Sequence, residues 1–199
     1  MKYLFTNVLC SIFLFTISLD ARGQTLKKYD MKSGIITFEN TISILGKAAP
    51  QKQIFYFDEY GMKECKELYE GDTLMETFLN DGKNLYTVVY EEKAAYHAGP
   101  AQKGTEGRFD WNAISDADKK NGKAKKLDSM TIAGKKCDAY EYTEGESKTV
   151  LVGWGHIILF ADGKSNGMYS TSKAVKIQEN VKITSEKFRV PTGFVIKKQ

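Results

Sequence analysis

The segment "FLNDGKNLYTVVY", residues 78–90, decides the fold class of this chain. At its centre, Asn80-Asp81-Gly82-Lys83 is a strong β-hairpin signal, because Asn, Asp and Gly tolerate the positive φ angles of tight turns. The flanking runs, Leu74 to Leu79 and Asn84 to Tyr90, are rich in apolar residues and have the length of strands. The segment therefore predicts two antiparallel strands joined by a tight turn.

The preceding segment, "IFYFDEYGMKECKELY" at residues 54–69, has the same pattern. Strands are expected over Gln53 to Asp58 and Met62 to Tyr69, with Asp58-Glu59-Tyr60-Gly61 as the turn and Gly61 as its left-handed residue. Adjacent carboxylates on a turn cannot bracket a substrate as a paired acid and base must. A calcium site is also disfavoured, because Tyr60 and Gly61 offer no side-chain oxygen ligand of the kind it needs. The segment is interpreted as a hairpin whose charges face solvent.

Apolar residues alternate with polar ones along most of the chain. In Gly34 to Gly46, Ile36 and Phe38 share one face with Ile42 and Ile44, and a break follows at Pro50. The further expected strands are Ala94 to Ala98, Met130 to Ile132, Lys136 to Thr143, Lys148 to Trp154, His156 to Phe160, Met168 to Gln178 and Phe188 to Ile196. The prediction is a mainly β fold, a large curved antiparallel sheet or unclosed β-barrel of about ten strands.

One short helical insert is expected within this sheet. Asp110 to Asn121 carries Trp111, Ile114 and Ala117 at spacings of three, and Gly122 follows as a stop signal. A curved sheet with a single helix cannot easily cover both of its faces. A partly exposed apolar concavity is therefore a real expectation, although most aromatic residues on the strands, Phe55 and Tyr140 among them, are interpreted as core.

The first 23 residues have the order of an export signal: a basic start, an apolar run from Tyr3 to Leu19, and the small-x-small pattern Ala21-Arg22-Gly23. Residues 1–23 are interpreted as a signal peptide, and residues 24–199 as a single β domain that begins at Gln24 and has no membrane span. The expected location is the periplasm or outer surface of a Gram-negative bacterium. Removing the signal changes the net charge from +4 to +3, which is too mild to indicate nucleic-acid binding. The lysine-rich run at residues 119–126 is interpreted as a solvated loop.

Two cysteines, Cys65 and Cys137, remain after signal removal. A disulfide between them is favoured in an oxidising compartment, and two separate buried thiols are the alternative. With His97 and His156 they could in principle form a nucleophile pair or a zinc site, but no protease signature, CxxC or HxxxH element supports either. No catalytic, cofactor-binding or metal-binding residue is assigned.

Two glycine-containing motifs remain. Gly163-Lys164-Ser165 imitates the end of a phosphate-binding loop, but the required preceding glycine is replaced by Ile158, so the motif is interpreted as a turn. Gly153-Trp154-Gly155-His156 places two glycines around a tryptophan in a strand. This pattern indicates a bulge or a close backbone approach, and a ligand contact is the alternative.

A family resemblance rests on several segments, from Lys32 to Ile196: "MKSGIITFENTISILG", "IFYFDEYGMKE", "FLNDGKNLYTVVYEEKAAY", "IAGKKCDAYEYTEG", "TVLVGWGHIIL" and "EKFRVPTGFVI". They resemble a family of uncharacterised exported bacterial proteins related to the LolA-like lipoprotein carriers and the lipoglycan-binding lipoproteins. The resemblance implies an unclosed antiparallel barrel that holds acyl chains or another apolar ligand on its concave side. The chain departs from the carriers in lacking an N-terminal helix and in having one short helix in its middle.

Two functions are consistent with these observations. The first is a non-enzymatic cell-envelope protein that binds a lipid, a lipoprotein or another apolar ligand in a concave sheet. The second is a structural or interaction protein of the envelope, which has a filled core and binds another envelope protein.

Overall fold

The computed structural model describes residues 27–198, except residues 45, 102–107 and 166–167. The expected signal peptide, residues 1–23, lies outside the described residues. The strands are β1 (Gly34–Ile44), β2 (Lys47–Asp58), β3 (Lys63–Glu70), β4 (Thr73–Asn80), β5 (Asn84–Val89), β6 (Ala94–Pro100), β7 (Ala124–Ile132), β8 (Lys135–Glu144), β9 (Ser147–Trp154), β10 (Ile157–Ser165), β11 (Met168–Glu179) and β12 (Val195–Lys198). The helices are short: η1 (Glu59–Gly61), η2 (Trp111–Ala113), α1 (Asp116–Lys120) and η3 (Ser185–Phe188).

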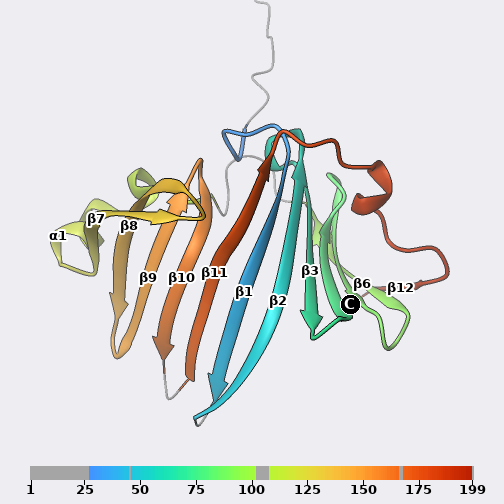
Figure 1. The fold of residues 1–199 in the computed structure, drawn as a ribbon, viewed down its shortest axis with the longest axis horizontal. Helices are drawn as coiled ribbons and strands as arrows, with labels where there is room; N and C mark the ends of the chain where they lie inside the picture. The colour runs from blue at the N-terminus through green and yellow to red at the C-terminus, as the bar shows by residue number, and fades with distance from the viewer. Residues whose placement is uncertain (1–26, 45, 102–107, 166–167, 199) are drawn as a thin grey trace, which may run out of the picture.

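All twelve strands form one sheet in the order β12-β6-β5-β4-β3-β2-β1-β11-β10-β9-β8-β7. Strands β1 to β6 form one meander and β7 to β11 another, and the antiparallel pairing of β1 with β11 joins them. Figure 1 shows the sheet curling between β7 and β8 at one side and β6 and β12 at the other. The predicted large, unclosed and mainly antiparallel sheet is confirmed. One pair differs, because β12 runs parallel to β6.

Two predicted strand boundaries are wrong. Pro50 does not break the chain but lies within β2, opposite Thr41 of β1. The pairing of β2 with β3 begins only at Lys52, so Pro50 occupies a stretch of β2 that is a sheet edge, where a missing N–H group is tolerated. The motif Gly163-Lys164-Ser165 is not a turn either, since β10 continues through it and pairs there with β9 and β11.

The C-terminal prediction is also wrong in part. Phe188 to Ile196 is not one strand: Phe188 ends the helix η3, and only Val195 begins β12. The Phe188 side chain is buried against Cys65 and Leu79. Packing on the face of the sheet therefore holds this residue in place, and it does not pair with a neighbouring strand.

The predicted helical insert is split into η2 and α1. Ser115, between them, has an extended backbone, and its hydroxyl accepts a hydrogen bond from the Asp118 amide. The extended backbone of Ile114 ends η2, and the Ser115 cap starts α1. The lysine-rich run at residues 119–126 is correspondingly shared between α1 and β7 and is not a loop throughout.

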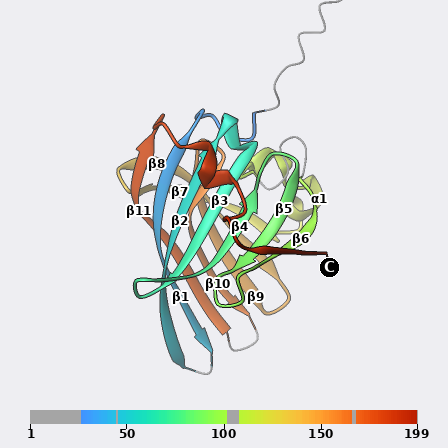
Figure 2. The same cartoon turned by 90° about the vertical axis from the view of Figure 1, so that its right-hand side faces the viewer.

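The sheet has two faces, which the strand register defines. The Phe55 face carries Ile36, Phe38, Phe55 and Phe57, and these residues pack against Tyr29 of the N-terminal segment. The opposite Cys65 face carries Cys65, Leu79, Tyr56 and Tyr86. The C-terminal segment covers the Cys65 face with Ile183, Phe188 and Val190; Figure 2 shows this segment crossing in front of β3 and β4.

No helix in the described part of the chain is long and apolar enough to span a membrane.

Candidate functional site

The β9–β10 turn organises one end of the sheet. Gly155 and His156 have φ angles of 55° and 67°, as the two central residues of a tight hairpin turn require. The carbonyl oxygen of Gly155 accepts a hydrogen bond from the Asp30 amide at 3.3 Å, and that of His156 accepts one from the Phe109 amide at 2.8 Å. The turn therefore anchors both the N-terminal segment and the segment that precedes η2.

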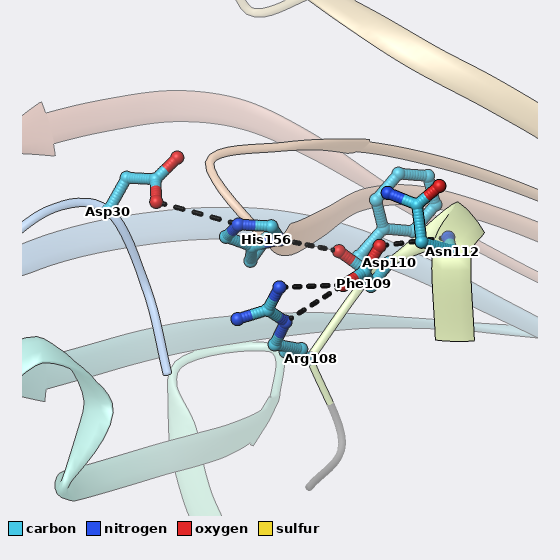
Figure 3. A network of polar contacts seen from close by, with 6 residues as sticks. All are labelled: Asp30, Arg108, Phe109, Asp110, Asn112 and His156. Carbon is cyan, nitrogen blue, oxygen red and sulfur yellow. Dashed lines mark hydrogen bonds and ion pairs between the residues drawn. The ribbon is translucent and has the colours of Figure 1, made fainter. Parts of the chain in front are cut away.

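The His156 side chain lies between these two segments (Figure 3). Its Nδ1 atom is 2.9 Å from the Phe109 carbonyl oxygen, and its Nε2 atom is 3.5 Å from Asp30 Oδ1. Since a carbonyl oxygen only accepts hydrogen bonds, Nδ1 carries the proton. The imidazole thus holds the two segments together and is not paired with a cysteine.

Gly153 makes the close approach that its sequence context indicates. A Cβ atom at this position would lie 2.5 Å from the Phe109 ring, which is too close for any side chain. The Phe109 ring in turn stacks on Tyr140 at a centroid distance of 4.8 Å, and Trp111 packs on Tyr140 at 5.5 Å. The backbone of Gly153 is thus closely approached, by the Phe109 ring and by the carbonyl oxygen of Ile157, which would lie 2.7 Å from a Cβ atom.

Asp110 fixes the position of Trp111 by capping η2. Its Oδ1 atom accepts a hydrogen bond from the Asn112 amide at 2.9 Å, and its Oδ2 atom accepts one from Arg108 Nη2 at 2.6 Å (Figure 3). The hydrogen bonds from Arg108, and then that from Asn112, lower the pKa of Asp110. This carboxylate is a positioning group, because its oxygens are occupied and it remains ionised.

These segments enclose a cavity of about 410 Å³, which we call the polar pocket. Strand β7 forms one side of the pocket and has a bulge there. Leu127 pairs with Ala139 and Met130 with Cys137, so Asp128 and Ser129 oppose the single residue Asp138. Bulges re-aim side chains at the edges of sheets and next to sites. The pocket is lined by Asp30, Phe109, Asp110, Trp111, Asn112, Lys126, Ser129, Lys136, Cys137, Asp138, Gly153, Trp154, Gly155 and His156.

The Phe55 face is concave. A single pocket of about 180 Å³, the central pocket, is lined by Lys66 of β3, Phe38 of β1 and Ile157 of β10. In a flat sheet, strands in the positions of β3 and β10 would be about 19 Å apart, because each strand spacing is about 4.8 Å. Strong curvature toward this face is therefore required to bring both to one small cavity. His156 lines the central pocket as well as the polar pocket.

Apolar side chains are exposed at two places on the concave face: Ile42 and Met168 lie at the end where β1 pairs with the start of β11, and Phe78 lies on β4, in register with Phe55. Ile36 and Phe57 are fully buried near Tyr29, whereas Ile42, Phe78 and Met168, on the same face, are 40%, 47% and 49% exposed. Phe78 lines a further cavity of about 210 Å³, the Phe78 pocket, with Leu79, Leu85, Ala98 and other residues of β3 to β6. The expected partly exposed apolar concavity is present.

Two charged residues interrupt this apolar lining. Glu64 and Lys66 both line the Phe78 pocket. Glu64 is bound by Lys28 at 2.9 Å and by the Tyr29 hydroxyl, so its charge is compensated within the protein. The Lys66 Nζ atom lies 5.2 Å from the centroid of the Phe55 ring, between the two pockets it lines.

The cysteines do not form a reactive site. Cys65 and Cys137 are both free and buried in the structure, in separate core clusters, so the expected disulfide is not formed. The reason lies in the sheet order, because five strands separate β3 from β8. Burial, with a smaller contribution from Glu67, raises the pKa of Cys65 to about 12, and burial also raises the pKa of Cys137. Both shifts oppose formation of the thiolate that a nucleophile needs.

The histidines have other partners. His97 Nε2 lies 3.1 Å from Asn84 Oδ1, and its ring packs on Tyr86. Within the described ranges, no group of three or more His, Cys, Asp and Glu residues could hold a metal ion.

A buried ion pair, which the sequence did not reveal, holds the C-terminal segment to the Cys65 face. Lys187 Nζ lies 2.6 Å from Glu67 Oε1, and the Glu67 side chain is 8% exposed. The Tyr69 hydroxyl donates to Glu67 Oε2 at 3.0 Å, and Lys187 Nζ lies 4.3 Å from the centroid of the Tyr56 ring. We call this group the C-terminal clamp. Its partners are 120 residues apart in sequence, so no local pattern predicts it.

No protein-family model matches the sequence. No curated protein matches it either.

Among solved structures, an uncharacterized conserved protein from Thermus thermophilus matches with a TM-score of 0.56 and 8% identity, over 88% of this chain and 95% of that one. MucB matches with a TM-score of 0.48 and 9% identity, over 86% of this chain and 62% of MucB. A LolA superfamily protein from Nitrosomonas europaea, the class that the sequence resembles, matches with a TM-score of 0.36 and 8% identity, over 82% and 92% of the two chains. At these identities the likeness to the Thermus protein shows a shared fold alone.

Proposed function

We propose that this protein is a non-enzymatic binding protein of the bacterial cell envelope that holds a lipid, or the acyl chain of a lipoprotein, against its concave Phe55 face. The observation that carries the proposal is the exposure of Ile42, Phe78 and Met168 on the same face as the buried core residues Ile36 and Phe57. Each Å² of apolar surface covered by a ligand contributes about 25 cal/mol, so an acyl chain along this face gains substantial free energy.

The charges on the concave face favour an amphiphile with an anionic head group. Glu64 is compensated by Lys28 and Tyr29, whereas Lys66 lies between the central pocket and the Phe78 pocket. An ammonium group beside an apolar pocket suits a carboxylate or phosphate attached to an alkyl chain.

Export is part of the proposal. The basic-apolar-small order of residues 1–23 supports cleavage before Gln24 and a location in the periplasm or on the outer surface of a Gram-negative bacterium. A net charge of +3 for residues 24–199 gives no support for nucleic acid as a partner.

The test uses the chain from residue 24 to 199, with the fluorescent probe 1-N-phenylnaphthylamine and palmitic acid as competitor. We expect the probe to bind and palmitic acid to displace it. Ile42→Lys and Phe78→Lys should each weaken probe binding at least about tenfold, because each places a charge where the apolar ligand lies.

Tyr169→Lys is the matched control. Tyr169 is 41% exposed, close to the 40% of Ile42, and follows Met168 on β11, where its side chain faces the opposite side of the sheet. Equal probe binding by all three variants and the unmodified chain would show that the ligand does not lie on the Phe55 face.

The alternative, an interaction protein whose partner is another envelope protein, makes a different prediction. Native mass spectrometry of the protein purified from its own envelope would then show a protein complex and no bound lipid.

A further inference from the structure

Both tryptophans of the chain, Trp111 and Trp154, line the polar pocket. The Asp110 cap on η2 fixes Trp111, and Trp154 directly precedes the Gly155-His156 turn. Phe109 adds a third ring, held rigidly between Gly153 and Tyr140. The pocket thus presents flat apolar surfaces on a preformed support, and it shares no lining residue with the Phe78 pocket.

The charges of the pocket disfavour an ionic ligand. A cation would meet Lys126 and Lys136, and each indole already has an ammonium group near its ring: Lys119 Nζ is 5.3 Å from the centroid of Trp111, and Lys135 Nζ is 4.3 Å from that of Trp154. An anion would meet the carboxylates of Asp30 and Asp138. A neutral ligand avoids both repulsions.

The polar groups of the pocket suit a ligand with many hydroxyl groups. The Asp138 carboxylate accepts hydrogen bonds, and among the described residues no side chain donates to it. The Asn112 amide and the Ser129 hydroxyl, which the β7 bulge brings to the pocket, can each donate and accept. A ligand with hydroxyl groups at its edge and C–H groups on its faces satisfies these groups and the rings together.

We propose that the polar pocket is a binding site for a neutral saccharide, which stacks on an indole and donates hydrogen bonds to Asp138. A cavity of about 410 Å³ is within the range of small-ligand sites and has room for one or two sugar rings. The site is independent of the proposed lipid site, with which it shares only His156 among the residues that line the central pocket.

The position of the tryptophans gives a direct assay. We would titrate the chain from residue 24 to 199 with maltose, cellobiose, lactose and N-acetylglucosamine, and record tryptophan emission together with saturation-transfer NMR of each sugar. Spermidine and inorganic phosphate serve as charged probes. At least one sugar should change the emission and receive saturation, while neither charged probe does so. Trp111→Phe and Trp154→Phe then identify the indole that reports the ligand.

Asp138→Ala should weaken sugar binding about tenfold or more, because it removes a charged hydrogen-bond acceptor. Asp128→Ala is the matched control, since Asp128 is the exposed bulge residue beside Ser129 but does not line the pocket. Both side chains are on the surface, and far-UV circular dichroism and melting curves verify that both variants fold. The proposal is overturned if no sugar of the panel binds at 50 mM, which is about the weakest affinity of interest, or if only spermidine or phosphate binds. It is also overturned if Asp138→Ala and Asp128→Ala bind the sugar equally.

Discussion

Lys187→Met should destabilise the protein far more than loss of an ordinary surface ion pair. The substitution removes the ammonium group that lies 2.6 Å from Glu67 and keeps a side chain of similar length over Tyr56. Glu67 is only 8% exposed, so its carboxylate would remain buried with tyrosine hydroxyls, those of Tyr69 and Tyr56, as its donors. Removing one partner of a buried pair costs about 3–5 kcal/mol. Because Lys187 itself is 30% exposed, we expect about 3 kcal/mol.

Thermal unfolding followed by circular dichroism measures this cost. For a domain of this size, 1 kcal/mol corresponds to about 2–4 °C, so Lys187→Met should lower Tm by about 6–12 °C. The double variant Glu67→Gln/Lys187→Met should recover much of the loss, since the buried charge is gone and Tyr69 keeps an acceptor.

Lys197→Met provides the control. Lys197 also holds the C-terminal part of the chain, through Glu92 at 3.3 Å, but the two side chains are 47% and 48% exposed. Pairs of this kind contribute about 0–1 kcal/mol. If Lys187→Met and Lys197→Met lower Tm by the same amount, burial does not make the clamp strong and the reasoning is refuted.

Other parts of the structure give four more predictions. Gly61→Val should cost more stability than Gly82→Val in chemical denaturation: both glycines have φ near 90°, but a Cβ at Gly61 would lie 2.6 Å from the Tyr29 ring, whereas at Gly82 the nearest atom is 3.5 Å away; equal losses would contradict this ranking. Thiol counting on the denatured, unreduced chain from residue 24 should find two free thiols, and a count of zero would establish the disulfide instead. Stability should fall as pH rises from 9 to about 12, because unfolding releases the Cys65 proton from a raised pKa; Cys65→Ala should flatten this part of the pH profile of urea unfolding, and an unchanged profile would argue against it. Mass spectrometry of the protein from its native envelope should find Gln24 as the first residue, and an intact Met1 there would exclude cleavage.

The hairpins could be predicted from the sequence because local chemistry specifies them. In the turn at residues 80–83, the side chains of Asn80 and Asp81 accept hydrogen bonds from the amides of Gly82, Lys83 and Asn84. Such contacts join residues two or three positions apart, so the residue types alone reveal them. The strand at residues 47–52 was missed for the opposite reason. Pro50 is compatible with a strand only because β3 does not extend to it, and the extent of a neighbouring strand is not a local property.

Only one part of the polar pocket, the β9–β10 turn, could be recognised in the sequence. The Gly153-Trp154-Gly155-His156 motif indicated a close approach, but Asp30 and Phe109 reach it from segments 126 and 47 positions from His156. The sequence did not single out Asp138 as a pocket residue, because Asp138 lies opposite a bulge in the neighbouring strand that no local pattern predicts. Side chains brought together by sheet topology cannot be recognised from spacing in a single sequence.

The place of β1 between β2 and β11 has a consequence for how the sheet assembles. One edge of β1 pairs at once with β2, the next strand in the chain, while the other must wait for β11. Residues 35–38 of β1 pair with residues 174–178 of β11, so this backbone edge has no partner strand until the chain has emerged as far as residue 178. An unpaired apolar edge recruits other strands, so the first meander is a template for aggregation until the second one arrives. A chaperone that protects the emerging chain would be most needed in this interval, and one bound at residues 35–38 would be displaced when β11 pairs with β1.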